Sequence, residues 1–332
     1  MTAIVVVENL TKRFSEDVLA VDGISFTVNE GEIFGFLGPN GAGKSTTINM
    51  LTTLLRPTGG KALVAGLDIA TEQDAVRKVI GLVPQDLTVD DELSGWENMY
   101  LQADLYNVPK EEAKRDIEEL IRVVNLEDAA DRRVKTYSGG MRKRLELAEG
   151  LIHHPRILFL DEPTLGLDIQ TRAAIWEYIK DLKTKHNITV FLTTHYLEEA
   201  DGLCDRIGII DHGKIVALDT PATLKRSVGG DVIELKVDSA VDLSDPIKNV
   251  EGILDVKKEN DTYRIKALKG EAAIPKVLLA VTNNGGTVTN VSLHRPSLDQ
   301  AFLEYTGRSL RDAESSGGFD RMAASRASRR RR

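Results

Sequence analysis

The stretch that decides the fold is a glycine-rich run: Gly38, Pro39, Asn40, Gly41, Ala42, Gly43, Lys44, Ser45 and Thr46. It fits the pattern G-x-x-x-x-G-K-[ST]. The apolar run Ile33–Leu37 precedes it, and Ile48, Leu51, Leu54 and Leu55 follow it at helical spacing. A buried strand, a glycine turn and a helix in this order predict a phosphate-binding loop. A purely structural glycine turn is the alternative.

The residue types in this run suit a triphosphate. Gly38, Gly41 and Gly43 remove side chains that would keep the backbone N–H groups away from it. The helix that begins near Lys44 directs its N-terminal partial positive charge at the phosphates. Lys44 would reach the β- and γ-phosphates, and Ser45 would offer its hydroxyl to Mg²⁺.

Two carboxylates, Asp161 and Glu162, end a second apolar run, Ile157–Leu160. Ligands of open α/β sheets bind at the carboxyl ends of the strands. Because side chains alternate along a strand, we expect the two to point to opposite sides. We assign Asp161 to Mg²⁺ and Glu162 to polarising the attacking water. Taken alone, the pair could be a plain charged strand end, and the glycine-rich run is what favours the catalytic interpretation.

A third motif, Ser138-Gly139-Gly140, opens a predicted helix at Met141–Leu151. Serine is a good N-cap, and Gly139 and Gly140 expose further N–H groups, so this helix end can also bind an anion. Taken alone, a plain capped helix is the alternative.

The order of patterns predicts an α/β fold with a second, smaller domain. Strand patterns at Ile157–Leu160 and Ile188–Thr193 flank a helical pattern at Thr171–Lys185, which predicts a parallel sheet with crossover helices in a domain over residues 1–226. Residues 88–154 are mainly helical in pattern. The first thirty residues contain short strands at Ile4–Glu8 and Ile24–Val28.

A change of composition at Ser227–Gly230 predicts a linker. Residues 231–306 then follow the order β-α-β-β-α-β, which predicts a small α+β domain of ferredoxin-like type. This domain is either a regulatory or dimer-stabilising module or a packing appendage. Residues 307–332 are predicted to be a disordered basic tail. Its end, Arg329–Arg332, would either contact anionic lipid headgroups or be a solvated chain end.

Bulk properties exclude several classes of protein. The 332 residues carry a net charge of −8, which argues against a nucleic-acid partner. Cys204 is the single cysteine, so we expect a reduced, buried thiol in a cytosolic protein. No run approaches the ~18 apolar residues that span a bilayer, and the N-terminus lacks the pattern of a signal peptide. Any membrane part would belong to another chain.

Together these motifs resemble the ABC (ATP-binding cassette) ATPase family over about the first 220 residues. The order is that of the family, and it includes further matching segments: Val83-Pro84-Gln85, Tyr137-Ser138-Gly139-Gly140-Met141 (which resembles the family signature), Leu165-Gly166-Leu167-Asp168 and Thr194-His195. The resemblance implies a P-loop cassette with a parallel-sheet core, an antiparallel β subdomain and a helical subdomain.

The resemblance also implies roles for single residues. Phe14 would stack on adenine, and Gln85 would contact Mg²⁺ and water and sense a membrane partner. His195 would clamp the γ-phosphate. Ser138 and Gly140, with Gly139 between them, would bind ATP held by a second cassette, and Asp168 would meet the opposite subunit. Alone, each position has a plainer interpretation: a core aromatic for Phe14, a loop residue for Gln85, a strand-end polar residue for His195 and a helix cap for Asp168.

The sequence departs from the family pattern at three positions. Tyr137 replaces the usual leucine, Met141 the usual glutamine, and Phe14 the commoner tyrosine. None of these changes removes a phosphate donor, so we expect ATP binding to survive. Met141 cannot make the polar contact of a glutamine, which bears on the strength of signature binding.

The variant Tyr-Ser-Gly-Gly-Met and the segment His294–Leu303 resemble the daunorubicin-resistance branch of the family. There the ATPase pairs with a separate membrane permease and exports drugs or other hydrophobic compounds. The resemblance implies ATP-driven dimerisation of two cassettes at the inner face of the cell membrane. Two alternatives are a soluble cassette that acts on ribosomes or DNA and a nucleotide sensor, the latter disfavoured by Glu162.

Overall fold

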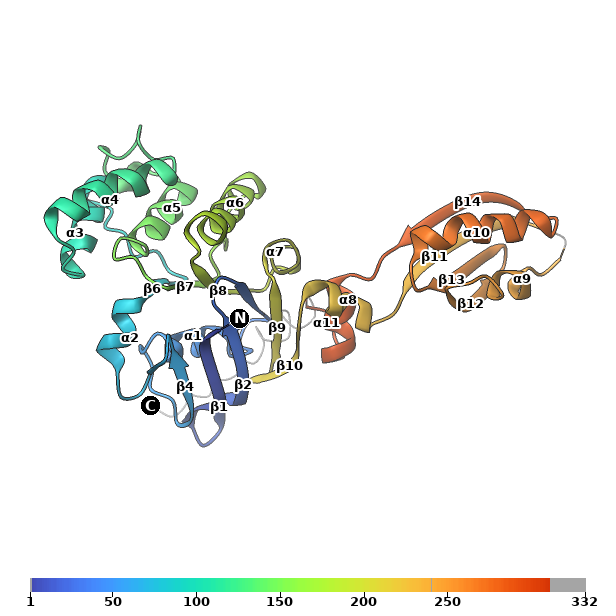
Figure 1. Ribbon diagram of the computed structural model, residues 1–332, viewed down its shortest axis with the longest axis horizontal. Coiled ribbons are helices and arrows are strands. Elements are labelled where there is room, and N and C mark those ends of the chain that lie inside the picture. The colour runs from blue at the N-terminus through green and yellow to red at the C-terminus, as the bar shows by residue number, and fades with distance from the viewer. Residues whose placement is uncertain (1, 240, 311–332) are drawn as a thin grey trace, which may run out of the picture. The chain divides into compact units, whose positions relative to one another are not determined.

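The computed structural model describes residues 2–239 and 241–310, and it divides the chain into two compact units (Figure 1). Of the described residues, the first unit comprises those up to Pro221 together with Leu310, and the second spans Ala222–Ser309. The linker predicted at Ser227–Gly230 therefore lies inside the second unit, a few residues beyond the division.

The first unit is built on a six-stranded sheet in the order β10-β9-β3-β8-β7-β6. All neighbouring pairs are parallel except β9 and β10, which form a hairpin. Every residue of β3, β7 and β8 is buried, as expected for parallel strands covered on both faces. The strands are β3 (Ile33–Leu37), β6 (Ile80–Val83), β7 (Ile157–Asp161), β8 (Thr189–Thr194), β9 (Arg206–Asp211) and β10 (Lys214–Asp219).

An antiparallel sheet, β2-β1-β4-β5, completes the β structure of this unit. Its strands are β1 (Ala3–Ser15), β2 (Val18–Asn29), β4 (Gly59–Val64) and β5 (Leu67–Asp68). The first two are much longer than the sequence predicts, and β4 was not predicted because its glycines look like a helix stop. Gly60 has φ 77°, and a side chain there would collide with the carbonyl of Asn9. This glycine is therefore what allows β4 to approach β1.

The helices of the first unit are α1 (Lys44–Leu51), α2 (Gln73–Val79), α3 (Gly95–Leu105), α4 (Lys110–Val123), α5 (Gly139–Glu149), α6 (Ile169–His186) and α7 (Leu197–Leu203), with a short 3₁₀ turn η1 (Val134–Thr136). Figure 1 shows α3, α4 and α5 grouped together as a helical part. Helix α1 ends before the predicted Leu55, and Thr53 just beyond its end has φ 64°. Cys204 is buried, as predicted. No helix of the described chain has the length and apolar character needed to cross a bilayer.

The second unit contains the predicted β-α-β-β-α-β order. It comprises most of α8 (Pro221–Ser227), then β11 (Asp231–Asp238), α9 (Ser244–Lys248), β12 (Ile253–Glu259), β13 (Thr262–Ala267), α10 (Gly270–Asn283), β14 (Thr287–His294) and α11 (Leu298–Thr306). The sheet order is β12-β13-β11-β14, antiparallel throughout. Of the predicted tail, residues 307–310 are described, and Leu310, which is grouped with the first unit, is buried. Residues 311–332, with the predicted arginine-rich end, lie outside the described residues.

Candidate active site

Four segments singled out in the sequence follow the carboxyl ends of neighbouring strands. The glycine-rich loop follows β3, Gln85 follows β6, Glu162 follows β7 and His195 follows β8. Since these four strands are parallel and adjacent, the segments after them lie along one edge of the sheet. The fold thus collects residues that are far apart in the chain.

A cavity of about 240 Å³ opens at this edge. It is lined by Ala20, Pro39, Asn40, Gly41, Gly43, Lys44, Ser45, Thr46, Gln85 and Glu162. Gly38 and Ala42 are buried and do not line it. A Cβ at Gly38 would collide with the carbonyl of Ile210, so only glycine permits this start of the loop. Ala20, which lies in β2 of the antiparallel sheet, also lines the cavity and was not predicted from the sequence.

The ammonium group of Lys44 lies against the carbonyl groups of the glycine-rich loop and is almost fully buried. Its Nζ donates to the carbonyl oxygens of Gly38 (2.6 Å) and Pro39 (3.2 Å) and lies 3.0 Å from Oε1 of Glu162. A phosphate that entered the cavity would compete with Glu162 for this charge.

Asp161 is the last residue of β7, and its carboxylate is held by two hydroxyls. Oδ1 accepts hydrogen bonds from Ser45 Oγ (3.1 Å) and from Thr193 Oγ1 of β8. Oxygen donors of this kind are those that Mg²⁺ prefers. Thr193 was not predicted as a site residue, because its only signal in the sequence is a hydroxyl in a buried strand.

Glu162 leaves the strand in a left-handed conformation, with φ 52°. Such a conformation in a bulky residue is often found at functional sites. Its Oε2 lies 2.6 Å from Nδ1 of His195. Burial opposes ionisation, but His195 and Lys44 outweigh it and lower the pKa of Glu162. The charged carboxylate can therefore orient a water and accept its proton.

The signature-like residues lie outside this cavity. The Ser138 Oγ caps α5 by accepting from the N–H of Met141 (3.3 Å), and Gly139 and Gly140 form the first turn. Neither they nor Asp168 and Phe14 line the cavity. The ring of Phe14 is 57 % exposed, with Lys12 Nζ 5.2 Å from its centre.

The beginnings of α5 and α6 meet at Thr171. A side chain at Gly140 would collide with that of Thr171. Asp168 caps α6 by accepting from the backbone N–H (3.0 Å) and the hydroxyl (2.7 Å) of Thr171, and these bonds lower the pKa of Asp168. The two helix starts therefore form one packed surface.

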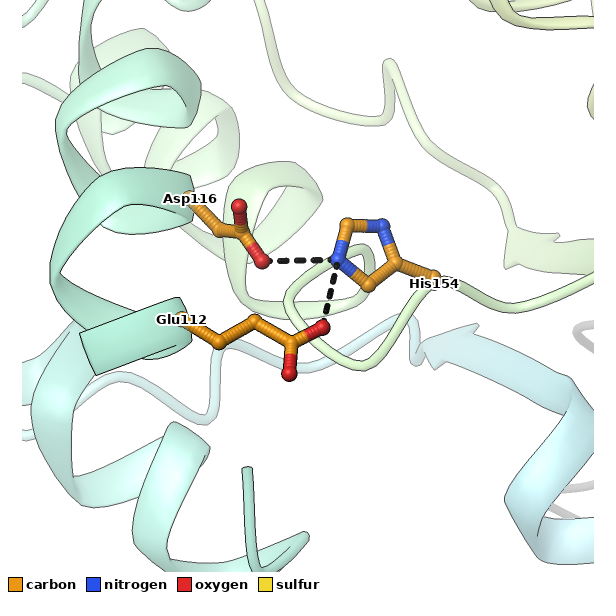
Figure 2. A group of neighbouring side chains, drawn as sticks. All are labelled: Glu112, Asp116 and His154. Atoms are coloured by element: carbon orange, nitrogen blue, oxygen red, sulfur yellow. Dashed lines mark hydrogen bonds and ion pairs between the residues drawn. The ribbon is translucent and has the colours of Figure 1, made fainter. Parts of the chain in front are cut away.

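Figure 2 shows a second polar group, Glu112, Asp116 and His154, none of which lines the cavity. Glu112 and Asp116 project from α4 toward His154, whose Nε2 is 2.7 Å from Asp116 Oδ2 and 4.0 Å from Glu112 Oε1. Burial opposes ionisation of Asp116, but contacts with His154 and Arg115 lower its pKa. These contacts give the buried carboxylate of Asp116 two partners, and the one with His154 links α4 to the segment between α5 and β7.

Comparison with known proteins identifies the family. Residues 21–165 match the family model described as ABC transporter, and residues 220–306 match the C-terminal domain of ATP-binding proteins like DrrA1-3. The chain is 42% identical to the daunorubicin resistance ATP-binding protein DrrA2 of Streptomyces coeruleorubidus, over 92% of this chain and 96% of that protein. The chain belongs to the ABC transporter ATP-binding proteins. It is therefore an ATPase subunit, as the site predicts.

Other relatives of this ABC subunit agree with the family. The linearmycin resistance ATP-binding protein LnrL of Bacillus subtilis is 37% identical over 92% of this chain and 99% of its own. Among solved structures, cbiO1 of Clostridium perfringens covers 69% of this chain and 94% of its own, with 26% identity and a TM-score of 0.64. The cassette MJ0796, in a dimer with ADP and Pi, covers 65% and 98%, with 27% identity and a TM-score of 0.59. These relatives do not favour a cassette that acts on ribosomes or DNA.

Proposed function

We propose that this ABC subunit powers export of a drug or other hydrophobic compound through a separate membrane permease. The observation that carries the proposal is the extent of similarity: proteins named for daunorubicin and linearmycin resistance match more than nine-tenths of the chain, including the second unit. ATP hydrolysis would take place at the inner face of the cell membrane, with no nucleic-acid partner.

ATP would bind with its phosphates in the cavity of the glycine-rich loop, and Phe14 would stack on adenine. The donor set Ser45, Asp161 and Gln85 suits Mg²⁺, because all three side chains offer oxygen atoms and two of them already share a hydrogen bond. Bound there, Mg²⁺ would offset charge on the β- and γ-oxygens.

Lys44 would bind the β- and γ-phosphates and give up its contact with Glu162. Glu162 would then orient the attacking water and accept its proton, with His195 holding Oε2 and contacting the γ-phosphate. The lowered pKa of Glu162 keeps this carboxylate in the form that can accept a proton.

A second copy of the cassette would complete each site. Ser138, Gly139, Gly140 and Asp168 do not line the cavity of their own chain, so they are available for the ATP and the surface of a partner copy. The dimeric form of the related cassette MJ0796 supports this arrangement. ATP would hold the two copies together, and hydrolysis would release them.

The permease would dock in a groove of about 670 Å³ between the sheet and α3. Among its lining residues, Leu54 and Leu105 are 63 % and 67 % exposed, so the groove offers apolar surface to a partner. The strand β6, which leads to Gln85, forms one wall through Ile80 and Leu82. A helix of the permease seated there would lie close to the chain that carries Gln85.

Export can be tested with inverted membrane vesicles from cells that express the protein together with its native permease. Uptake of daunorubicin, followed by its fluorescence, should require ATP and be lost with Glu162→Gln. Equal uptake by wild-type and Glu162→Gln vesicles would exclude the protein as the motor of that transport. Uptake of an unrelated hydrophilic dye is the control for leaky vesicles.

A further inference from the structure

The loop that carries Gln85 is held at both of its ends by one helix. Lys143 Nζ on α5 donates to the carbonyl oxygen of Pro84 (2.8 Å), directly before Gln85. Glu146 Oε1, also on α5, accepts from the backbone N–H (2.5 Å) and the hydroxyl (3.0 Å) of Thr88. Only three residues, Gln85 to Leu87, lie between these attachment points, and all three are exposed.

The two side chains that hold the loop form a buried ion pair. Lys143 Nζ lies 3.1 Å from Glu146 Oε2, and the two residues are 5 % and 2 % exposed. Burying an ion pair is costly, and well-packed apolar residues often replace one without loss of stability. The remaining hydrogen bonds of Lys143 and Glu146 go to the backbone of Pro84 and to the backbone and hydroxyl of Thr88. These bonds fix the loop in one position relative to the helix.

Helix α5 is also the helix whose first turn carries Gly139 and Gly140 of the signature, and it is called the signature helix below. We propose that Lys143 and Glu146 are positioning residues that hold Gln85 at the cavity and make its loop move together with the signature helix. The proposal rests on the proposed role of Gln85 as a contact of Mg²⁺ and water. Because this pair ties the loop to the helix, a movement of the signature helix toward a partner copy would also move Gln85.

The test is the double variant Lys143→Met/Glu146→Leu, which removes both charges and leaves neither unpaired. Hydrogen–deuterium exchange in peptides that contain Thr88 should rise about tenfold or more, because a bond to a charged acceptor is lost. ATPase turnover should fall by at least about tenfold and need more Mg²⁺ for half-maximal rate, while ATP affinity measured without Mg²⁺ stays within about twofold.

A matched control exists on α6, where Lys180 and Glu177 form an exposed pair with the same spacing, 3.0 Å apart. Lys180→Gln/Glu177→Gln should change none of these readouts. Unchanged exchange at Thr88 in the test variant would overturn the attachment, and faster exchange with unchanged turnover would overturn the positioning role.

Two further variants keep the test decisive. If the double variant does not fold, Lys143→Gln/Glu146→Gln keeps polar side chains of similar length and removes both charges. Exchange at Thr88 should still rise, because its N–H then donates to a neutral acceptor in place of a charged one, and no rise would overturn the proposal. The variant Gln85→Ala tests the role of Gln85 separately from the attachment of its loop to α5. Wild-type turnover in Gln85→Ala would refute the role of Gln85, whereas exchange at Thr88 reports on the attachment alone.

Discussion

Lys44 and Glu162 form a buried ion pair, with Nζ 3.0 Å from Oε1. One is the residue expected to bind phosphate, and the other is the residue expected to orient water. Because a nucleotide would draw the charge of Lys44 toward its phosphates, Glu162 would lose one partner on ATP binding and keep His195. If these roles hold, the contact between Lys44 and Glu162 would couple ATP binding to the release of the carboxylate that orients water.

The variant Glu162→Gln should bind ATP but hydrolyse it about 100-fold or more slowly, because the amide cannot accept the proton of the attacking water. ATP should then persist between two copies, so dimer should accumulate. Steady-state phosphate release and size-exclusion chromatography with ATP and Mg²⁺ measure the two effects. A turnover rate equal to wild type would refute this role of Glu162.

The variant Lys44→Ala should bind ATP at least about tenfold more weakly, because a charge-assisted contact to phosphate is lost. A direct binding titration measures this. Lys180→Ala, an exposed lysine on α6, is the control and should bind as wild type does. Wild-type affinity in Lys44→Ala would contradict the phosphate-loop assignment.

Glu149 on α5 should make stability depend on pH. Burial, followed by the nearby charge of Glu146, raises the pKa of Glu149 from 4.5 to about 8. The unfolded chain loses this proton near pH 4.5 and the folded chain near pH 8, so stability falls as pH rises between these values, by up to about 1.4 kcal/mol per pH unit.

In Glu149→Gln this part of the pH dependence should vanish. The variant should therefore gain stability over wild type as pH rises from 5 to 8, measured by chemical unfolding at both values. Glu118→Gln, an exposed change on α4, should behave as wild type. Parallel curves for wild type and Glu149→Gln would show that the side chain is ionised in the folded state.

Tyr137 replaces the usual leucine of the signature, and its buried hydroxyl donates to the carbonyl oxygen of Ala129 (2.8 Å). Tyr137→Phe should lower the free energy of unfolding by about 1 kcal/mol and leave ATP turnover unchanged, because the bond is structural. Thermal unfolding measures the effect, with the exposed Tyr100→Phe as control. Lower ATP turnover in Tyr137→Phe protein that is fully folded would show that the hydroxyl of Tyr137 contributes to ATP binding or hydrolysis.

Much of the site could be predicted because its residues follow strands whose apolar runs are visible in the sequence. The run Ile33–Leu37 locates the phosphate loop, and Ile157–Leu160 locates Asp161 and Glu162. Contacts between elements that are far apart in the sequence could not be predicted. Thr193 reaches Asp161 from a neighbouring strand, and Glu146 reaches Thr88 from 58 positions along the chain. Neither residue has a local pattern that distinguishes it.

The fold predictions failed where local signals had two meanings. Gly59 and Gly60 indicate the end of a helix, yet they also begin β4, because a bare backbone is needed beside Asn9. The strands β1 and β2 extend far beyond their apolar centres, since pairing with each other satisfies backbone groups that the sequence pattern does not reveal.

The separation of Ser138 from the cavity of its own chain has a kinetic consequence. If a complete active site needs the cavity of one copy and the Ser138 segment of another, specific activity should depend on protein concentration and decline steeply on dilution. A permease that carries one cassette on each half would abolish this dependence by keeping the two at a high effective concentration. The free subunit would then hydrolyse ATP slowly, and turnover would rise when the permease binds two copies.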